Sequence, residues 1–320
     1  MPLAPEIKEL MAMIAEAPPE VIGGPDLTIE EARELVEVGA ALTTPPEQRS
    51  TVASAEDHTV PGPAGPVPVR VYRPARTTSS PVPTLLWAHG GGWCSGSLET
   101  ADTAARALCS LAEVVVVSVG YRLAPEAPFP AGLDDCAAAL AWVRGTVAEL
   151  GGDPARIGVG GDSAGGNLAA VLAQAVGSHG VPLAAQMLVY PATDLDLTTD
   201  AYPSREALGT GYLFETAELV RCVERYLTAG DDPADPRVSP LRGTDLSTTP
   251  PALIVTVEYD PLRDEGTAYA ARLRAAGVPV VHQDVAGLAH GTFDMLGLSE
   301  TARTAMAEAA RALKALFASR

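Results

Sequence analysis

Beyond residue 67 the chain alternates between short apolar runs and longer alanine-rich stretches, and this alternation constrains the fold more than any other feature. The run at 67–72 alternates apolar and polar residues as a half-buried strand does, whereas the later runs are largely apolar and rich in branched residues. Those later runs lie at 84–88, 114–119, 157–160, 184–190 and 252–257, and the alanine-rich stretches at 132–150, 164–176, 266–276 and 299–318. Strand followed by helix, repeated, predicts an α/β fold with a mostly parallel central sheet flanked by helices.

Two segments stand outside this rhythm. The first is residues 1–50, where one helix is predicted over 6–17 and a second begins at a capping box, Thr28-Ile29-Glu30-Glu31, and runs towards Leu42. The second is the stretch of about sixty residues between the runs that end at 190 and begin at 252, far longer than the usual connection. It contains a predicted helix over 216–227. We predict that residues 1–50 and the insertion at about 195–250 form a helical cap on a catalytic domain spanning 51–320.

Charge and composition exclude several kinds of partner. The chain has 22 basic and 40 acidic residues and a formal net charge of −18. An acidic surface repels phosphate backbones and anionic lipids, so neither nucleic acid nor membrane is expected as a partner. The first ten residues do not resemble a signal peptide and no apolar run approaches membrane-spanning length, so we expect a cytoplasmic protein. The four cysteines are scattered without ligand spacing, and neither a metal nor a cofactor is expected.

The motif Gly161-Asp162-Ser163-Ala164-Gly165 lies between the predicted strand at 157–160 and the predicted helix that begins at 164. A serine on such a tight turn is pushed out above the sheet, and only glycine fits beside it where neighbouring elements approach. The helix N-terminus places amide N–H groups nearby. An ordinary glycine-rich strand-to-helix turn is the alternative. In this context the motif predicts that Ser163 is a nucleophile.

A serine nucleophile needs a base, and the chain order of this fold, serine then acid then histidine, selects among the histidines. The five are His58, His89, His179, His282 and His290. The first two precede Ser163, His179 lies at the far end of its helix, and His282 lies inside a predicted strand at 279–285. His290 follows that strand in a predicted loop, 287–291, from which a side chain can reach the top of the sheet. The base is therefore predicted to be His290.

The acidic partner of the histidine stays ambiguous from spacing alone. Four carboxylates follow the two preceding strands: Asp194, Glu258, Asp260 and Asp264. Each could equally be a solvated loop residue.

A second glycine motif, His89-Gly90-Gly91-Gly92-Trp93, directly follows the predicted strand at 84–88. Bare backbone N–H groups in such a loop can bind the oxyanion of an acyl-transfer reaction. A phosphate-binding loop is the alternative, but it would need a lysine that is absent here.

Taken together, these motifs resemble the bacterial hormone-sensitive-lipase-like esterases of the α/β-hydrolase fold. The likeness runs from about residue 67 to the C-terminus and rests on HGGGW at 89–93, YRLAPE at 121–126, GDSAGGN at 161–167, DPRVSPL at 235–241, DPLRDEG at 260–266 and HG at 290–291. The resemblance implies a triad of Ser163, Asp260 and His290. It also implies an oxyanion hole from the N–H groups of Gly91, Gly92 and Ala164, and a helical cap made from the two segments described above.

The resemblance further implies that His89 shapes its loop, and that the segment 121–126 is scaffolding whose Ala124-Pro125 bond is a candidate for the cis form. One departure is visible, because Thr292 separates His290-Gly291 from Phe293, where the family usually has an aromatic residue directly.

We therefore expect a serine carboxylesterase that acts on short- to medium-chain acyl esters through an acyl-enzyme intermediate. The alternatives are an amidase, a deacetylase or a lactonase with the same triad, and a non-catalytic ligand receptor on the same fold, which would lack the histidine present here. Leu213 and Phe214, at the start of the insertion's helix, are candidates for the acyl pocket or for cap packing. The strand near 279–285 is a candidate edge for pairing in a homodimer.

Overall fold

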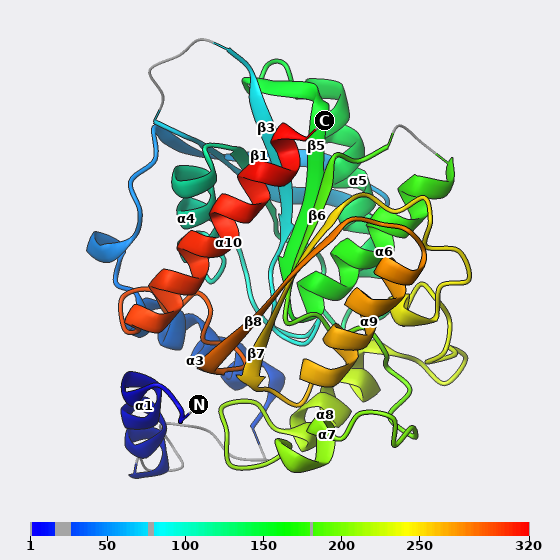
Figure 1. The fold of residues 1–320 in the computed structure, drawn as a ribbon. Helices are drawn as coiled ribbons and strands as arrows, with labels where there is room; N and C mark the ends of the chain where they lie inside the picture. The colour runs from blue at the N-terminus through cyan, green and yellow to red at the C-terminus, as the bar shows by residue number, and fades with distance from the viewer. Residues whose placement is uncertain (1, 17–26, 76–79, 180–181, 320) are drawn as a thin grey trace.

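The computed structural model describes residues 2–16, 27–75, 80–179 and 182–319. Within these ranges eight strands form one sheet in the order β1-β2-β4-β3-β5-β6-β7-β8 (Figure 1). The strands from β4 to β8 run parallel, whereas β1 and β2 form an antiparallel hairpin that joins the sheet antiparallel to β4. Their bounds are β1 Ser54–Gly62, β2 Gly65–Arg73, β3 Val82–Ala88, β4 Val115–Val119, β5 Gly152–Asp162, β6 Ala185–Val189, β7 Ala252–Tyr259 and β8 Val280–Ala289.

Helices cover both faces of the sheet. Helices α4 and α10 pack together on one face, and α5, α6 and α9 pack on the other (Figure 1). The helix bounds are α1 Pro5–Glu16, α3 Ile29–Thr43, α4 Asp102–Ala112, α5 Ala131–Thr146, α6 Ala164–His179, α7 Ser204–Ala207, α8 Thr216–Tyr226, α9 Arg263–Ala275 and α10 Glu300–Ala318. This arrangement confirms the predicted α/β-hydrolase fold with a mostly parallel sheet.

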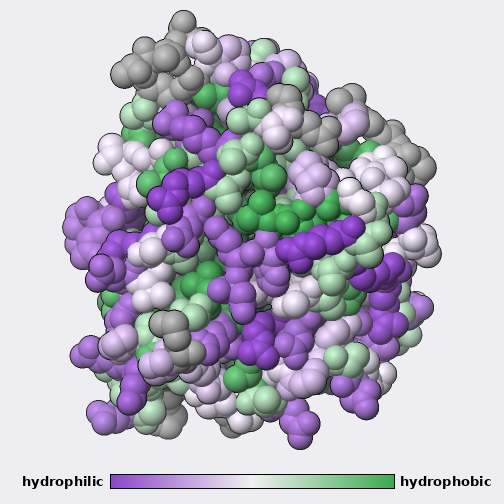
Figure 2. All heavy atoms as spheres, viewed as in Figure 1, coloured by the Kyte–Doolittle hydropathy of each residue, from purple (hydrophilic) through white to green (hydrophobic). Residues whose placement is uncertain are grey.

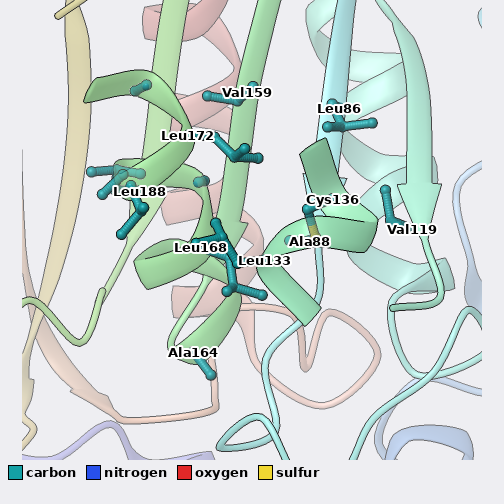
Figure 3. Packing of buried hydrophobic residues seen from close by; sticks show 14 of the residues in the cluster. Leu86, Ala88, Val119, Leu133, Cys136, Val159, Ala164, Leu168, Leu172 and Leu188 are labelled. Carbon is teal, nitrogen blue, oxygen red and sulfur yellow. The ribbon is translucent and has the colours of Figure 1, made fainter. Parts of the chain in front are cut away.

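Successive side chains of the central strands point to opposite faces of the sheet and form two hydrophobic layers. In β3, Leu85 and Trp87 point into the layer under α4 and α10, whereas Leu86 and Ala88 point into the layer under α5 and α6. Figure 3 shows residues of the second layer, among them Leu86 and Val159 of the sheet and Leu168 and Leu172 of α6. Burial on both sides explains why these strands are almost continuously apolar in sequence.

Several elements differ from their sequence-based prediction. Strand β1 was not expected, because it is an edge strand whose side chains are mostly exposed and which therefore carries no apolar pattern. Helix α4 and the short helix α7 were also not predicted. Strand β8 continues to Ala289, whereas a loop was expected from 287, because β8 resumes pairing with β7 at Tyr259 after a register shift. His290 therefore directly follows a strand.

The N-terminal helices and the insertion between β6 and β7 lie at the end of the sheet towards which β7 and β8 point (Figure 1). Thr28 caps the N-terminus of helix α3. Its hydroxyl accepts from Glu31 N at 3.2 Å while Glu31 accepts from Thr28 N at 2.8 Å, so the capping box predicted from sequence is present. The side chain of Arg33 fastens α3 to the body through Glu126 at 2.7 Å and the Cys94 carbonyl at 2.8 Å.

Helix α1 is attached to segments from the opposite end of the chain. Ala4 N donates to the Gly287 carbonyl at 2.8 Å, and the Ser299 hydroxyl donates to Glu6 at 2.8 Å. In the insertion, Arg205 of α7 forms a buried ion pair with Glu265 of α9 at 2.6 Å. The peptide bonds Ala124-Pro125 and Phe129-Pro130 are cis.

Two properties of the surface bear on function. Hydrophilic residues surround smaller apolar patches on the face shown in Figure 2, in keeping with the net charge of −18. In the described part of the chain, no helix combines the length and apolar character that crossing a bilayer requires.

Candidate active site

Ser163 lies between the end of β5 and the start of α6, in a strained backbone conformation with φ of +54°. The positions on either side of the turn require glycine, because a larger side chain would collide with neighbouring backbone. A Cβ atom on Gly165 would lie 2.1 Å from the Ala88 carbonyl oxygen, and one on Gly161 would lie 2.5 Å from the same atom. Because β3 approaches this closely, the turn folds only with glycine at both positions. The result is a serine hydroxyl raised above the carboxyl end of the sheet.

A continuous chain of hydrogen bonds joins Ser163 to a histidine and an acid. Ser163 Oγ lies 2.8 Å from His290 Nε2, and His290 Nδ1 lies 2.8 Å from Asp260 Oδ2. All three are buried, and Asp260 also accepts from Leu262 N at 2.8 Å. A carboxylate on Nδ1 fixes the imidazole tautomer, with Nδ1–H donating to Asp260 and Nε2 free to accept the serine proton. The three residues follow β5, β7 and β8, which end at the same edge of the sheet.

The other candidate acids have different partners. Asp194 pairs with Arg242 at 2.8 Å, Glu258 accepts from Gly287 N at 2.9 Å, and Asp264 accepts from Ser204 N at 2.8 Å. The four carboxylates that spacing left open are therefore distinguished by tertiary contacts, and Asp260 is the one that meets His290.

The remaining histidines have structural surroundings. His89 is buried against Tyr121, with ring centroids 4.3 Å apart, and its Nδ1 contacts the Gly90 carbonyl at 2.7 Å. Burial lowers the pKa of His89 to about 4, so it is neutral. His282 lies in β8 and contacts Thr256 Oγ1 at 2.9 Å, and His58 lies in the edge strand β1. Helix α6 ends at His179, far from Ser163.

The glycine loop after β3 curls over the same edge of the sheet. Gly91 and Gly92 have φ of +112° and +59°, and Gly90 N donates to Asp162 Oδ1 at 3.0 Å. In the described part of the chain, the N–H groups of Gly91, Gly92 and Ala164 have no hydrogen-bond acceptor. Unpaired backbone donors beside a serine hydroxyl can bind a developing oxyanion.

A cavity of about 590 Å³ opens above Ser163 and His290. Its walls come from α3, from α8 and from the segment 212–215 that leads into α8. Phe214 stacks on His290 with ring centroids 4.5 Å apart, and Leu213 also lines the cavity. The structure thus brings both sequence-predicted pocket residues to the site. It also brings Glu218 there, and burial raises the pKa of this carboxyl.

A second cavity of about 550 Å³ adjoins the first, and the two share Gly91, Asp162 and Tyr190. Its wall is mainly apolar and includes Leu10 and Ile14 of α1.

Tyr190, Asp294 and Cys222 are among the residues that the structure places here and that sequence reasoning missed. Tyr190 lies against His290 with centroids 4.4 Å apart. No local pattern identifies such residues, because only the tertiary fold brings them to the serine.

The described residues contain no group of three or more histidine, cysteine or acidic side chains arranged to hold a metal ion. All four cysteines are free and buried.

Comparison with known proteins agrees with this geometry. A family model described as alpha/beta hydrolase fold matches residues 85–294. The chain is 40% identical to the carboxylesterase NlhH of Mycobacterium tuberculosis, over 97% of this chain and 96% of that protein. It is 36% identical to an arylesterase of Saccharolobus solfataricus, over 99% of this chain and all of that protein.

Among solved structures, the hyperthermophilic esterase of Pyrobaculum calidifontis is 36% identical and superposes with a TM-score of 0.89, covering 98% of this chain and 99% of that chain. The sequence likeness and the shared fold extend over nearly the whole length of each protein. The chain therefore belongs to the α/β-hydrolase family, among its hormone-sensitive-lipase-like carboxylesterases.

Proposed function

We propose that this carboxylic ester hydrolase cleaves short- to medium-chain acyl esters with Ser163 as nucleophile, His290 as general base and acid, and Asp260 as the partner of His290. The observation that carries the proposal is the unbroken hydrogen-bond chain from Ser163 Oγ through His290 to Asp260, with distances of 2.8 Å at both steps. The relatives named as a carboxylesterase and an arylesterase support hydrolysis of esters.

The reaction proceeds in two acyl-transfer steps. His290 Nε2 takes the proton as Ser163 Oγ attacks the ester carbonyl, and Asp260 stabilises the imidazolium. The N–H groups of Gly91, Gly92 and Ala164 bind the oxyanion. The alcohol leaves with the proton from His290, and a water activated by the same histidine then releases the acid.

The size of the substrate follows from the walls of the site. Two cavities of about 590 and 550 Å³ meet at Gly91, Asp162 and Tyr190, and Ser163 lines the first, which leaves room for a small ester with one arm in each. We assign Leu213 and Phe214 to the acyl pocket because both line the first cavity beside His290. We also assign residues 1–50 and about 195–250 to a cap over the catalytic domain, since α3 and α8 form walls of that cavity.

Replacement of the nucleophile tests the proposal. Ser163→Ala should lower kcat/KM for 4-nitrophenyl butyrate by about 10⁴-fold or more, because the acyl-enzyme no longer forms. Ser118→Ala, a buried serine of β4 whose hydroxyl has no partner among the described residues, is the matched control and should keep full activity.

A panel of 4-nitrophenyl esters of graded acyl length, with matched anilides, N-acetyl amides and lactones, separates the ester hydrolase from an amidase, deacetylase or lactonase. Substantial turnover by Ser163→Ala would refute the mechanism. Binding of a panel member without its hydrolysis by the wild-type protein would favour a receptor.

We further propose that β8 pairs with β8 of a second copy to form a homodimer. The sheet ends at β8, and Val281 on this strand is 39% exposed. The N-terminal segment covers the strand near Gly287, which leaves the part around 280–285 for pairing. Sedimentation should show a dimer for the wild type and a monomer for Val281→Lys; equal masses for the two proteins would exclude this interface.

A further inference from the structure

Two carboxyl groups that the proposed mechanism does not use lie behind the nucleophile. Asp162 immediately precedes Ser163, and Asp294 lies four residues beyond His290. Both line the apolar cavity, together with Gly90, Tyr190 and Gly291. Three loops, those of the serine, the oxyanion donors and the histidine, therefore meet at this pair.

Asp162 makes a direct contact with the oxyanion loop. Its Oδ1 accepts from Gly90 N at 3.0 Å, and a Cβ atom on Gly90 would lie 2.3 Å from its Oδ2. The carboxyl group thus fills the space beneath Gly90, the residue next to the proposed donor Gly91. A shift of this side chain would move the donors relative to Ser163.

No cation neutralises the pair, since neither Asp162 nor Asp294 forms an ion pair within the part of the chain that the structure describes. The groups that face Asp162 are the carboxyl of Asp294, the ring of His290, the phenols of Tyr190 and Tyr121, and the Gly90 N–H. Burial and the Asp294 carboxylate raise the pKa of Asp162 to about 7, and burial raises the pKa of Asp294 to about 6. Two carboxyls in the wall of one cavity ionise stepwise, because the second charge must form near the first.

We propose that Asp162 and Asp294 are positioning residues: as a pair with a single negative charge, they hold the oxyanion loop and the histidine loop against the nucleophile turn. Asp294, which has the lower pKa, carries the charge, and Asp162 keeps the proton while its Oδ1 accepts from Gly90 N. The proton on Asp162 removes the repulsion between the two groups. When the second proton leaves, two negative charges repel each other and oppose the oxyanion that forms nearby. The pair then sets the alkaline limit of turnover.

The test is a set of pH profiles of kcat and KM for hydrolysis of 4-nitrophenyl butyrate between pH 6 and 9. For the wild type, kcat should fall by more than about threefold between pH 7.5 and 9 as the second carboxyl ionises. Asp294→Asn removes one of the two charges, so the ratio of kcat at pH 9 to kcat at pH 7.5 should rise at least about twofold above that of the wild type. Asp200→Asn, an exposed aspartate, should reproduce the wild-type profile.

Two variants of Asp162 test the contact with Gly90. Asp162→Ala loses the acceptor, so kcat should fall at least tenfold while KM changes little, and Asp162→Asn, which keeps an acceptor oxygen, should restore most of that loss. Identical alkaline limbs in the wild type and Asp294→Asn would overturn the inference. Should Asp162→Ala fail to fold by circular dichroism, Asp294→Asn and Asp162→Asn still decide the matter.

The inference rests on the proposed function, and the same measurements distinguish their failures. A wild-type protein that hydrolyses none of the esters would refute the proposed function. A wild-type protein that hydrolyses them with a profile insensitive to Asp294→Asn would refute only the role of the carboxyl pair.

Discussion

Gly92 is a residue of the oxyanion loop that contacts the insertion. A Cβ atom there would lie 2.4 Å from Cys222 Sγ, and the backbone has φ of +59°. Cys222 belongs to α8, so one missing methyl group lets the insertion pack directly on the loop that carries the proposed donors.

Gly92→Ala should therefore lower kcat about 10²- to 10³-fold, the effect of losing one oxyanion donor, because the loop must move away from α8. Steady-state kinetics on a 4-nitrophenyl ester would measure it. Shortening the neighbour in Gly92→Ala/Cys222→Gly should recover part of the loss. Gly145→Ala, in helix α5, where the added methyl group meets nothing within 4 Å, is the control. A fully active Gly92→Ala protein would contradict the contact.

The carboxyl pair of Asp162 and Asp294 also has a consequence for stability. Their pKa values in the folded protein, about 7 and about 6, lie above the ordinary aspartate value of about 3.9. At pH values between about 4 and about 7, these carboxyls bind protons in the folded protein but are ionised in the unfolded chain. The free energy of unfolding therefore falls as pH rises through this range.

Asp294→Asn removes one of the two ionising groups, and with it part of this loss of stability at high pH. Its melting temperature should exceed that of the wild type by about 2–4 °C at pH 8, for a gain on the order of 1 kcal/mol, and should match the wild type near pH 4. Scanning calorimetry at the two pH values would measure the difference. A gain that is the same at both pH values would mean that packing, not ionisation, is responsible.

Individual site residues could be predicted from the sequence where they belong to a local motif. The glycine-bounded turn indicated Ser163, and chain order singled out His290 among five histidines. The choice of Asp260 needed the family resemblance, because four carboxylates had equivalent spacing. Asp294 escaped notice because its importance depends on Asp162, which lies 132 residues earlier in the chain.

Helix α3 shows how one element can govern substrate binding without touching the triad. Its residues Leu35 and Val36 line both cavities, and Arg33 fixes it to Glu126 and to the Cys94 carbonyl. The Arg33–Glu126 pair is partly exposed, so its contribution to global stability is at most about 1 kcal/mol.

Arg33→Met should accordingly raise KM several-fold with little change in melting temperature, because the cavity wall loosens while the sheet stays intact. Arg73→Met is a matched control, since Arg73 pairs with Glu56 at 2.8 Å with similar exposure but lies on the β1–β2 hairpin. Kinetics and thermal melts of both variants would check the difference. Equal changes in KM would show that the anchor of α3 is irrelevant to binding.

Strands were predictable from sequence where both of their faces are buried. The parallel strands, buried on both faces, appeared as apolar runs, whereas β1 exposes most of its side chains and escaped prediction. The strand was predicted to end at residue 285 and a loop to begin at 287, whereas β8 continues to Ala289. The positive φ of +78° at Gly287 favours a turn but is accommodated within a register shift of the strand. Tertiary pairing with β7 overrides that local preference.

For the whole molecule, the dominant electrostatic property is the net charge of −18. Such a charge repels anionic molecules and attracts cationic ones over a distance that salt controls, since the Debye length falls from about 30 Å at 0.01 M to about 8 Å at 0.15 M ionic strength.

Raising ionic strength between these limits should therefore increase kcat/KM for an ester that carries a carboxylate and decrease it for one that carries a quaternary ammonium group. A neutral ester of the same length is the control and should change little. Discontinuous activity assays at constant pH would measure how kcat/KM of each of the three substrates depends on ionic strength. Parallel changes for all three substrates would point to an effect of salt on the fold instead.

The overall architecture was the most predictable feature, because repeated alternation of strand and helix leaves few topologies. The assignment of residues 1–50 and about 195–250 as one cap stays a prediction. Their arrangement depends on contacts between segments distant in sequence, such as Arg33 with Glu126 and Arg205 with Glu265.

The attachment of α1 has a consequence for biosynthesis. This helix is synthesised well before its partners, the Gly287 carbonyl and the Ser299 hydroxyl, which lie more than 280 residues further along the chain. At about 5–20 residues per second, translation separates the two events by tens of seconds. During that interval Leu10 and Ile14 have no finished cavity to line, and the nascent chain exposes an apolar helix that a chaperone can hold. The enzyme is thus expected to become active only after residues 287–299 have been synthesised.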